Sequence, residues 1–287
     1  MKRIIFAGIA ALTAFHAAAF EWPQDDVQRE AFSSYFGQNR GGTLSTSMVF
    51  RNSGKIKAMD DGKILVMMTE QENDTDFFPS ALGNSVIIAH ADSLISVYGN
   101  LERESLVQAA EMQDSVKSGS PLGAGGNSGW QESRSGLEFQ IIDTKNSNAV
   151  NPKVFMPRTD NEIELTATNV CIENRNGDRF ELWTQRNFPA GIYRVYQRRN
   201  QTAAPYRTTI LVNGVIVDQI MYDTIIQDGH DVCAVGKRKY NEREIYPDQK
   251  LQFLGEAMLT QGRTTLGITL EDIRGEANKA NYSLSIY

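Results

Sequence analysis

The chain has 287 residues and a net charge of −6, from 35 acidic and 29 basic side chains. An acidic surface is poorly suited to the phosphates of nucleic acids or to anionic lipids, so we expect no nucleic-acid partner. The length allows one or two domains, each with a buried core.

The first nineteen residues have the pattern of a secretory signal peptide. Lys2 and Arg3 precede a short apolar run, and Ala17-Ala18-Ala19 supplies a cleavage site of small residues. That run is too short to cross a bilayer, and no other stretch approaches a transmembrane segment. We therefore expect residues 1–19 to be cleaved and the mature chain to be periplasmic or secreted, with no membrane span.

Short apolar runs rich in Val and Ile, bounded by Gly, Asn or Pro, follow one another between residues 83 and 152. Such runs are typical of short strands joined by tight turns. The runs and turns are Gly83-Asn84-Ser85-Val86-Ile87-Ile88-Ala89-His90, Leu94 to Leu101, Val116 to Gly123, Gly126-Asn127-Ser128-Gly129, Leu137-Glu138-Phe139-Gln140-Ile141 and Val150-Asn151-Pro152.

Over about residues 35–157, the order of these pieces resembles the lysostaphin/LytM-type zinc endopeptidases of bacterial cell walls. That family reads G-N-x-V-x-I-x-H, T-x-Y-x-H-L, V-x-x-G-x-x-I-G, G-x-T-G and H-L-H-F-E-I, followed by a strand and N-P. The resemblance implies the family's duplicated hybrid motif, which is a β-sheet with a groove. It also implies a zinc ion that cleaves peptidoglycan crosslinks.

The residues that would hold and assist this zinc are replaced. The family's ligands are the His and Asp of H-x-x-x-D and the second His of H-x-H, and two further histidines assist the chemistry. At the ligand positions this sequence has Ser45, Val49 and Glu138. At the positions of the assisting histidines it has Asn100 and Gly136.

The remaining histidines do not restore the site. Of the three, His16 leaves with the signal peptide, His90 aligns with a family histidine that is not a ligand, and His230 lies in the second domain. Residues 37–56 contain neither His nor Asp. A catalytic zinc needs three such ligands and one position open to water, so we expect no zinc, no other cofactor and no catalysis.

Five residues are expected along the groove that the resemblance implies: His90, Tyr98, Asn100, Trp130 and Glu138. Trp130 either fills space, forms a wall of the groove or stacks on a sugar. We leave these three roles open.

Two other constellations have a chemical interpretation. His90 and Asp92 share one face if they lie on a strand and could then meet one metal, although such a pair more often ends a strand. Glu138 with Asp143 or Glu132 would form a glycosidase pair only at the right separation, which sequence spacing does not fix.

After Pro157 the polar residues 158–161 are a plausible linker, and short alternating strands follow. The runs include residues 163–172 and 191–196, and the strongest hairpin spans Thr208 to Val217 around Asn213-Gly214. This spacing predicts an antiparallel β-sandwich over residues 158–287, with an immunoglobulin-like form as one version. Residues 20–157 would form the peptidase-like domain, and the fold class is mostly β.

Cys171 and Cys233 are the only cysteines. In an oxidising compartment a disulfide between them is allowed, and two buried free thiols are the alternative.

Arg194, Arg198, Arg199 and Arg207 make the middle of the second domain locally basic. A solvated face is the default interpretation, and a docking patch for an acidic partner is the other.

Two functions follow from these observations. The first is an inactive, peptidase-like envelope protein that binds, scaffolds or regulates in peptidoglycan metabolism. Its partner would be peptidoglycan or an envelope protein such as a cell-wall hydrolase. The alternative is an active zinc metalloendopeptidase that cleaves peptidoglycan crosslinks.

Overall fold

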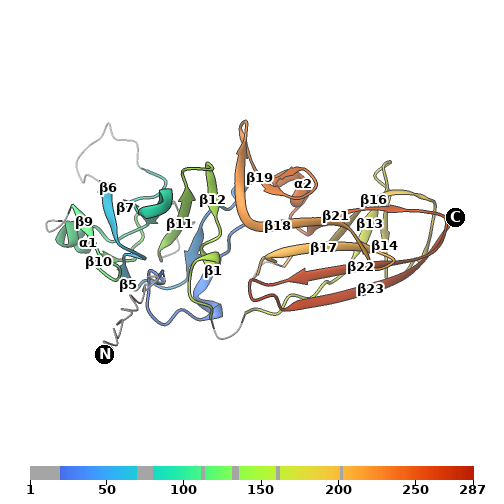
Figure 1. Cartoon of the computed structure of the whole chain (residues 1–287), viewed down its shortest axis with the longest axis horizontal. Coiled ribbons are helices and arrows are strands. Elements are labelled where there is room, and N and C mark those ends of the chain that lie inside the picture. The colour runs from blue at the N-terminus through green and yellow to red at the C-terminus, as the bar shows by residue number, and fades with distance from the viewer. Residues whose placement is uncertain (1–19, 70–79, 111–113, 131–135, 160–161, 201–202) are drawn as a thin grey trace, which may run out of the picture.

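The computed structural model describes residues 20–69, 80–110, 114–130, 136–159, 162–200 and 203–287. These residues fold mostly into β-strands (Figure 1), as the sequence predicts. None of the described helices is long and apolar enough to cross a membrane. The predicted signal peptide, residues 1–19, lies outside the described residues.

The described residues of the first half form twelve short strands, one α-helix and three turns of 3-10 helix. The strands are β1 (Phe32–Ser34), β2 (Asn39–Arg40), β3 (Thr43–Leu44), β4 (Met48–Phe50), β5 (Lys55–Lys57), β6 (Gly62–Met68), β7 (Ser85–Ala89), β8 (Leu94–Gly99), β9 (Ser115–Val116), β10 (Pro121–Ala124), β11 (Glu138–Asp143) and β12 (Asn148–Val150). The helices are α1 (Arg103–Ala110), η1 (Arg29–Ala31), η2 (Ala91–Ser93) and η3 (Pro152–Val154).

In the second half, the residues that the structure describes form further strands, several of them longer, and one short α-helix. The strands are β13 (Cys171–Glu173), β14 (Arg179–Glu181), β15 (Asn187–Phe188), β16 (Gly191–Arg198), β17 (Arg207–Val212), β18 (Val215–Asp228), β19 (Asp231–Val235), β20 (Lys239–Asn241), β21 (Leu251–Leu259), β22 (Gly262–Glu271) and β23 (Ala277–Ile286). The helix is α2 (Glu242–Ile245).

Strand β11 is central to the first half. It pairs with β8 along its whole length and with β4 at its beginning, so that Glu138 lies opposite both Gly99 and Val49. Phe139 and Ile141 alternate with more polar neighbours and are fully buried, because successive side chains of a strand point to opposite faces. The strand therefore presents Glu138 on the face opposite its buried aromatic residue.

The second half is a sandwich of two β-sheets. Strands β15, β23, β22, β17 and the start of β18 form one layer, and β14, β13, β16 and β21 form the other. Ile210, Ile268 and Leu284 from the first layer share a core with Val195 and Leu254 from the second. The prediction of a second β domain is confirmed, and its immunoglobulin-like form stays a prediction.

The predicted hairpin is present as β17 and β18. Val212 pairs with Val215, and the intervening Asn213 and Gly214 have φ values of 52° and 81°. Both values lie in the left-handed region that Asn-Gly adopts readily in a two-residue hairpin turn.

The two halves share one continuous sheet (Figure 1). The far end of β18 leaves the sandwich and pairs with β12, Ala149 lying opposite Ile225. Next to this ladder, the side-chain Nδ2 of Asn151 donates to the backbone oxygen of Tyr222 at 3.0 Å. One hydrophobic core also draws residues from both halves. The boundary after Pro157 stays a prediction.

One predicted strand is wrong over most of its length. Of residues 163–172, only the last two belong to a strand, β13, and residues 162–168 belong to none. The alternation is still visible, because Leu165 is buried while Glu164 and Thr166 are exposed. Alternation reports which side chains meet the core, whereas a strand also requires a hydrogen-bonded neighbour.

Candidate functional site

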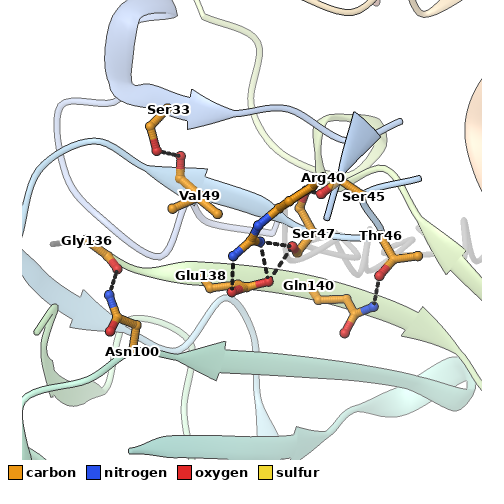
Figure 2. Close-up of polar contacts among 10 residues, drawn as sticks. All are labelled: Ser33, Arg40, Ser45, Thr46, Ser47, Val49, Asn100, Gly136, Glu138 and Gln140. Carbon is orange, nitrogen blue, oxygen red and sulfur yellow. Dashed lines mark hydrogen bonds and ion pairs between the residues drawn. The ribbon is translucent and has the colours of Figure 1, made fainter. Parts of the chain in front are cut away.

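Glu138, at one of the three positions where the sequence resemblance implies a metal ligand, is paired with an arginine (Figure 2). Arg40 Nη1 donates to Oε1 at 2.7 Å, and Nη2 donates to Oε2 at 3.1 Å. Both side chains are largely buried, with 23% of Arg40 and 14% of Glu138 exposed. A two-pronged, charge-assisted contact of this kind is among the stronger polar interactions in proteins.

Ser47 adds a third bond to the same carboxylate. Its Oγ donates to Glu138 Oε1 at 2.6 Å and accepts from Arg40 Nη1 at 3.3 Å. Ser45, at a predicted ligand position, instead donates to the backbone oxygen of Ser47 at 2.9 Å. Val49, at the other position, is a buried aliphatic residue directly opposite Glu138. The three positions thus hold one hydroxyl that is bonded to the backbone, one hydrocarbon and one carboxylate that is already engaged.

Asn100, at the first of the two assisting positions, acts as a structural bridge. Its Nδ2 donates to the oxygens of Gly136 at 2.6 Å and Gly126 at 3.0 Å, and its Oδ1 accepts from the nitrogen of Gly129 at 2.8 Å. Its φ of 62° is left-handed, which Asn tolerates better than most residues. The side chain is fully buried, so it holds the surrounding loops together and does not line an open groove.

Gly136, at the second assisting position, leaves no room for a side chain. Its φ is 130°, and a Cβ there would lie 2.1 Å from the backbone oxygen of Phe50. A histidine at this position would therefore require the backbone to move.

Among the other residues expected along the groove, Tyr98 is buried. Its hydroxyl oxygen accepts a hydrogen bond from the backbone nitrogen of Met59 at 2.9 Å, and burial raises the pKa of Tyr98 to about 12. Trp130 differs, because 58% of its surface is exposed. It is the one of the five that offers a ligand a large apolar face.

His90 is held by two neighbours at the end of β7. Nδ1 lies 2.8 Å from the backbone oxygen of Asp61, and Nε2 lies 2.6 Å from Ser96 Oγ. Asp92 follows within the 3-10 turn η2 rather than on the strand, with a φ of 57°. Both ring nitrogens are thus engaged, and the geometry favours the structural interpretation of this pair.

The glycosidase pair gains no support from Asp143. This carboxylate caps a turn, with Oδ1 accepting from the nitrogens of Lys145 at 2.9 Å and Asn146 at 3.1 Å. Glu132 lies outside the described residues.

The residues at the site do not fit a zinc ion. In the part of the chain that the structure describes, no three His, Cys, Asp or Glu side chains are grouped so that they could hold a metal. The one carboxylate at the expected place has an arginine beside it. We therefore derive no chemical step through a metal.

Arg40 and Ser47 are the site residues that sequence reasoning missed. A carboxylate buried in place of a neutral imidazole needs a cation nearby, since an unpaired buried charge is costly. Arg40 is the only basic residue between positions 30 and 50, which is the signal that could have identified it.

The second half of the chain holds the β2–β3 hairpin that carries Arg40. The Asn39 side chain bonds to Glu242 at the start of α2, and Arg199 Nη2 donates to the Asn39 backbone oxygen at 3.0 Å. The hydroxyl of Tyr246 donates to the backbone oxygen of Gly37 at 3.0 Å. Contacts from α2 and from the residues that follow α2 and β16 thus fix the chain just before the arginine.

Cys171 and Cys233 are two buried free thiols in this structure, which favours the second of the two alternatives. Burial raises the pKa of Cys171 to about 11 and also raises the pKa of Cys233.

The predicted basic patch is partly neutralised. Arg194 lies within ion-pair distance of Glu256 at 3.6 Å, and Arg207 makes a two-pronged pair with Glu271.

Comparisons with known proteins place the first half in a family. Residues 45–152 match the model of Peptidase family M23, and a second family model without a description matches residues 164–287. A Treponema pallidum protein described as uncharacterized is 32% identical over 139 residues, which cover 45% of this chain and 92% of that protein. The fold and the site arrangement define a peptidase-like β domain. The chain belongs to peptidase family M23 through this domain.

Several solved structures resemble part of the chain. A mutant of the catalytic domain of EnpA, a prophage-encoded M23 protein from Enterococcus faecalis, is 26% identical and has a TM-score of 0.34, covering 42% of this chain and 88% of that one. A zinc-containing peptidase from Vibrio cholerae is 21% identical, with a TM-score of 0.33. The match covers 43% of this chain and 36% of that one. A complex of SpoIIIAH and SpoIIQ contains a chain that is 20% identical, with a TM-score of 0.38. The match covers 48% of this chain and 99% of that one.

Proposed function

We propose that this chain is a catalytically inactive member of peptidase family M23 whose first domain binds or scaffolds in peptidoglycan metabolism. Its ligand is peptidoglycan or an envelope protein such as a cell-wall hydrolase. Its compartment is the periplasm or the exterior of the cell.

The observation that carries this proposal is the Arg40–Glu138 pair. Two unit charges of the same sign at about 4 Å repel by roughly 4 kcal/mol at the effective dielectric constant of a protein surface. The repulsion between Arg40 and a divalent cation would be larger, because the energy scales with the product of the charges. A zinc ion approaching Glu138 would therefore meet the positive charge of Arg40 as well as the loss of two hydrogen bonds. Neither Ser45 nor Val49 offers a ligand that would offset this cost.

The backbone around the site supports the same proposal. Gly136 has no space for an imidazole, and Asn100 uses its amide to hold three loop segments together. At both positions where the resemblance implies an assisting histidine, the residue present therefore has a structural role.

Trp130 is the residue through which we propose that a glycan is bound. An exposed indole can stack on the apolar face of a sugar ring, as aromatic side chains do in recognition sites. Trp183 in the second half is more exposed, at 73%, and serves as a matched control for a loss of exposed indole.

The test uses purified chain with dye-labelled peptidoglycan sacculi. We expect no release of dye, co-sedimentation of the protein with the sacculi, and weaker co-sedimentation for Trp130→Ala but not for Trp183→Ala. Dye release that a chelator abolishes would instead establish the active endopeptidase. Equal sedimentation of both variants would remove Trp130 from the binding surface.

A further inference from the structure

The segment from Ile163 to Ala167 resembles a strand that lacks its neighbour. Ile163, Leu165 and Ala167 contact the core of the sandwich, whereas Glu164 and Thr166 are exposed. Within the described residues, no backbone hydrogen bond involves these five residues. The next residue, Thr168, accepts one from the nitrogen of Arg198 at 2.9 Å. The segment is thus anchored at one end and by its buried side chains, while its backbone stays free to pair.

An open cleft of about 850 Å³ lies beside this segment and is lined by its exposed side chains. Its walls include Glu164, Thr166 and Thr168 on the segment and Arg198 and Lys250 at the adjoining ends of β16 and β21. A cleft of this size is large enough for the side chains of a short peptide.

The basic side chains of the cleft are largely not neutralised by carboxylates of the described residues. Neither Arg198 nor Lys250 makes an ion pair or a side-chain hydrogen bond with another described residue. The Nε of Arg199, which also lines the cleft, is buried and has no partner among the described residues. Among the described residues that line the cleft, the carboxylates are Glu164 and Glu181, so the cations there outnumber the anions in a chain whose net charge is −6.

We infer that this cleft receives an extended segment of a partner protein, which adds to residues 163–167 as a neighbouring strand and places a carboxylate against Arg198 and Lys250. Main-chain hydrogen bonds supply affinity in this mode of recognition, and alternate side chains supply specificity. The free backbone groups require an extended polypeptide, and the unpaired cations select an acidic one. This site lies outside the M23 domain and does not depend on the function proposed for it.

The first test measures hydrogen exchange of the full chain. Amides of residues 163–167 should exchange as fast as those of an exposed loop, whereas those of the paired strand β22 should be slow. Slow exchange in the free protein would show that the segment already has a partner and would overturn the inference.

The second test adds a labelled peptide of alternating Glu and Val and follows fluorescence anisotropy and hydrogen exchange. We expect saturable binding, protection of residues 163–167, and affinity about tenfold weaker for the double variant Arg198→Glu, Lys250→Glu. The charge-matched control is Lys237→Glu with Lys279→Glu, which leaves the cleft intact. Absent binding, equal binding by both double variants, or equal binding of a Lys and Val peptide would contradict the inference.

Discussion

At the scale of single residues, the site is defined by one carboxylate and by the groups that already use its oxygens. Glu138 accepts from Arg40 and Ser47, and it lies opposite Val49, which has nothing to offer a metal. The guanidinium is a fixed cation supplied by the chain itself. A histidine at position 138 would be neutral and would need no such partner. The carboxylate of Glu138 carries a charge, and the guanidinium compensates it.

Replacing Arg40 should show how strongly this pair is coupled. Arg40→Met removes two charge-assisted hydrogen bonds from a mostly buried carboxylate, and we expect a loss of about 1–3 kcal/mol in the free energy of unfolding. Arg40→Met combined with Glu138→Gln should recover part of that loss, because the buried negative charge that Arg40 offsets is then absent. Urea denaturation of the single and double variants gives the coupling.

Lys117→Met is the control for this experiment. Its pair with Asp61 is exposed, so its removal should change stability little. A loss for Arg40→Met no larger than that for Lys117→Met would show that the buried pair contributes nothing.

The two thiols make a second prediction at this scale. A raised pKa favours the neutral thiol, and with a pKa of about 11 only roughly one Cys171 in a thousand is the reactive thiolate at pH 8. Labelling by a disulfide reagent should therefore be slow in the native chain and should speed up as the pH rises toward 11. After unfolding, both thiols should react rapidly, and a chain with no reactive thiols then would contain a disulfide.

At the scale of elements, the sequence predicts those that local chemistry determines. The hairpin around Asn213-Gly214 follows from its turn residues, and β11 follows from the alternation around Phe139. The strand expected from residue 163 fails, because its pairing depends on a neighbour that sequence does not specify. The Arg40–Glu138 pair was missed for the same reason, since it joins residues 98 positions apart.

Two glycines with left-handed φ give a prediction at this scale: Gly37 precedes the β2–β3 hairpin, and Gly41 lies in its turn. Gly37 has a φ of 79°, and a Cβ there would lie 2.8 Å from Cδ1 of Tyr222, whereas Gly41, at 61°, has no atom within 4 Å of that position. Gly41→Ala should cost about 1 kcal/mol from backbone strain alone, and Gly37→Ala about 1–3 kcal/mol.

Thermal denaturation of the two variants side by side measures this difference. A larger loss for Gly37→Ala would show that the contact between the hairpin and β18 is tight. Equal losses would mean that Tyr222 moves aside at no cost.

At the scale of the whole molecule, the continuous sheet and the shared core join the two halves. Strand β18 belongs to the sandwich at one end and pairs with β12 at the other (Figure 1). We expect calorimetry to show one cooperative transition for the chain. Asn151→Ala, which removes a buried bond to Tyr222, should lower its midpoint or split it in two. Two separate transitions in the unaltered chain would contradict this coupling.

The second half also holds the hairpin that delivers Arg40 to Glu138. The site is therefore a property of the whole chain, because Glu242, Arg199 and Tyr246 lie far from it in sequence. Their contacts explain how an arginine from a short two-stranded turn is kept against the carboxylate.

The most direct measurement of the central claim is the zinc content of the purified chain after growth in zinc-supplemented medium. With an arginine paired to Glu138 and no imidazole at any of the expected ligand positions, we predict a zinc content far below one atom per chain, unchanged in Glu138→Ala. A zinc content close to one atom per chain that is lost in Glu138→Ala would contradict the account, because it would show that Glu138 binds a metal instead of pairing with Arg40.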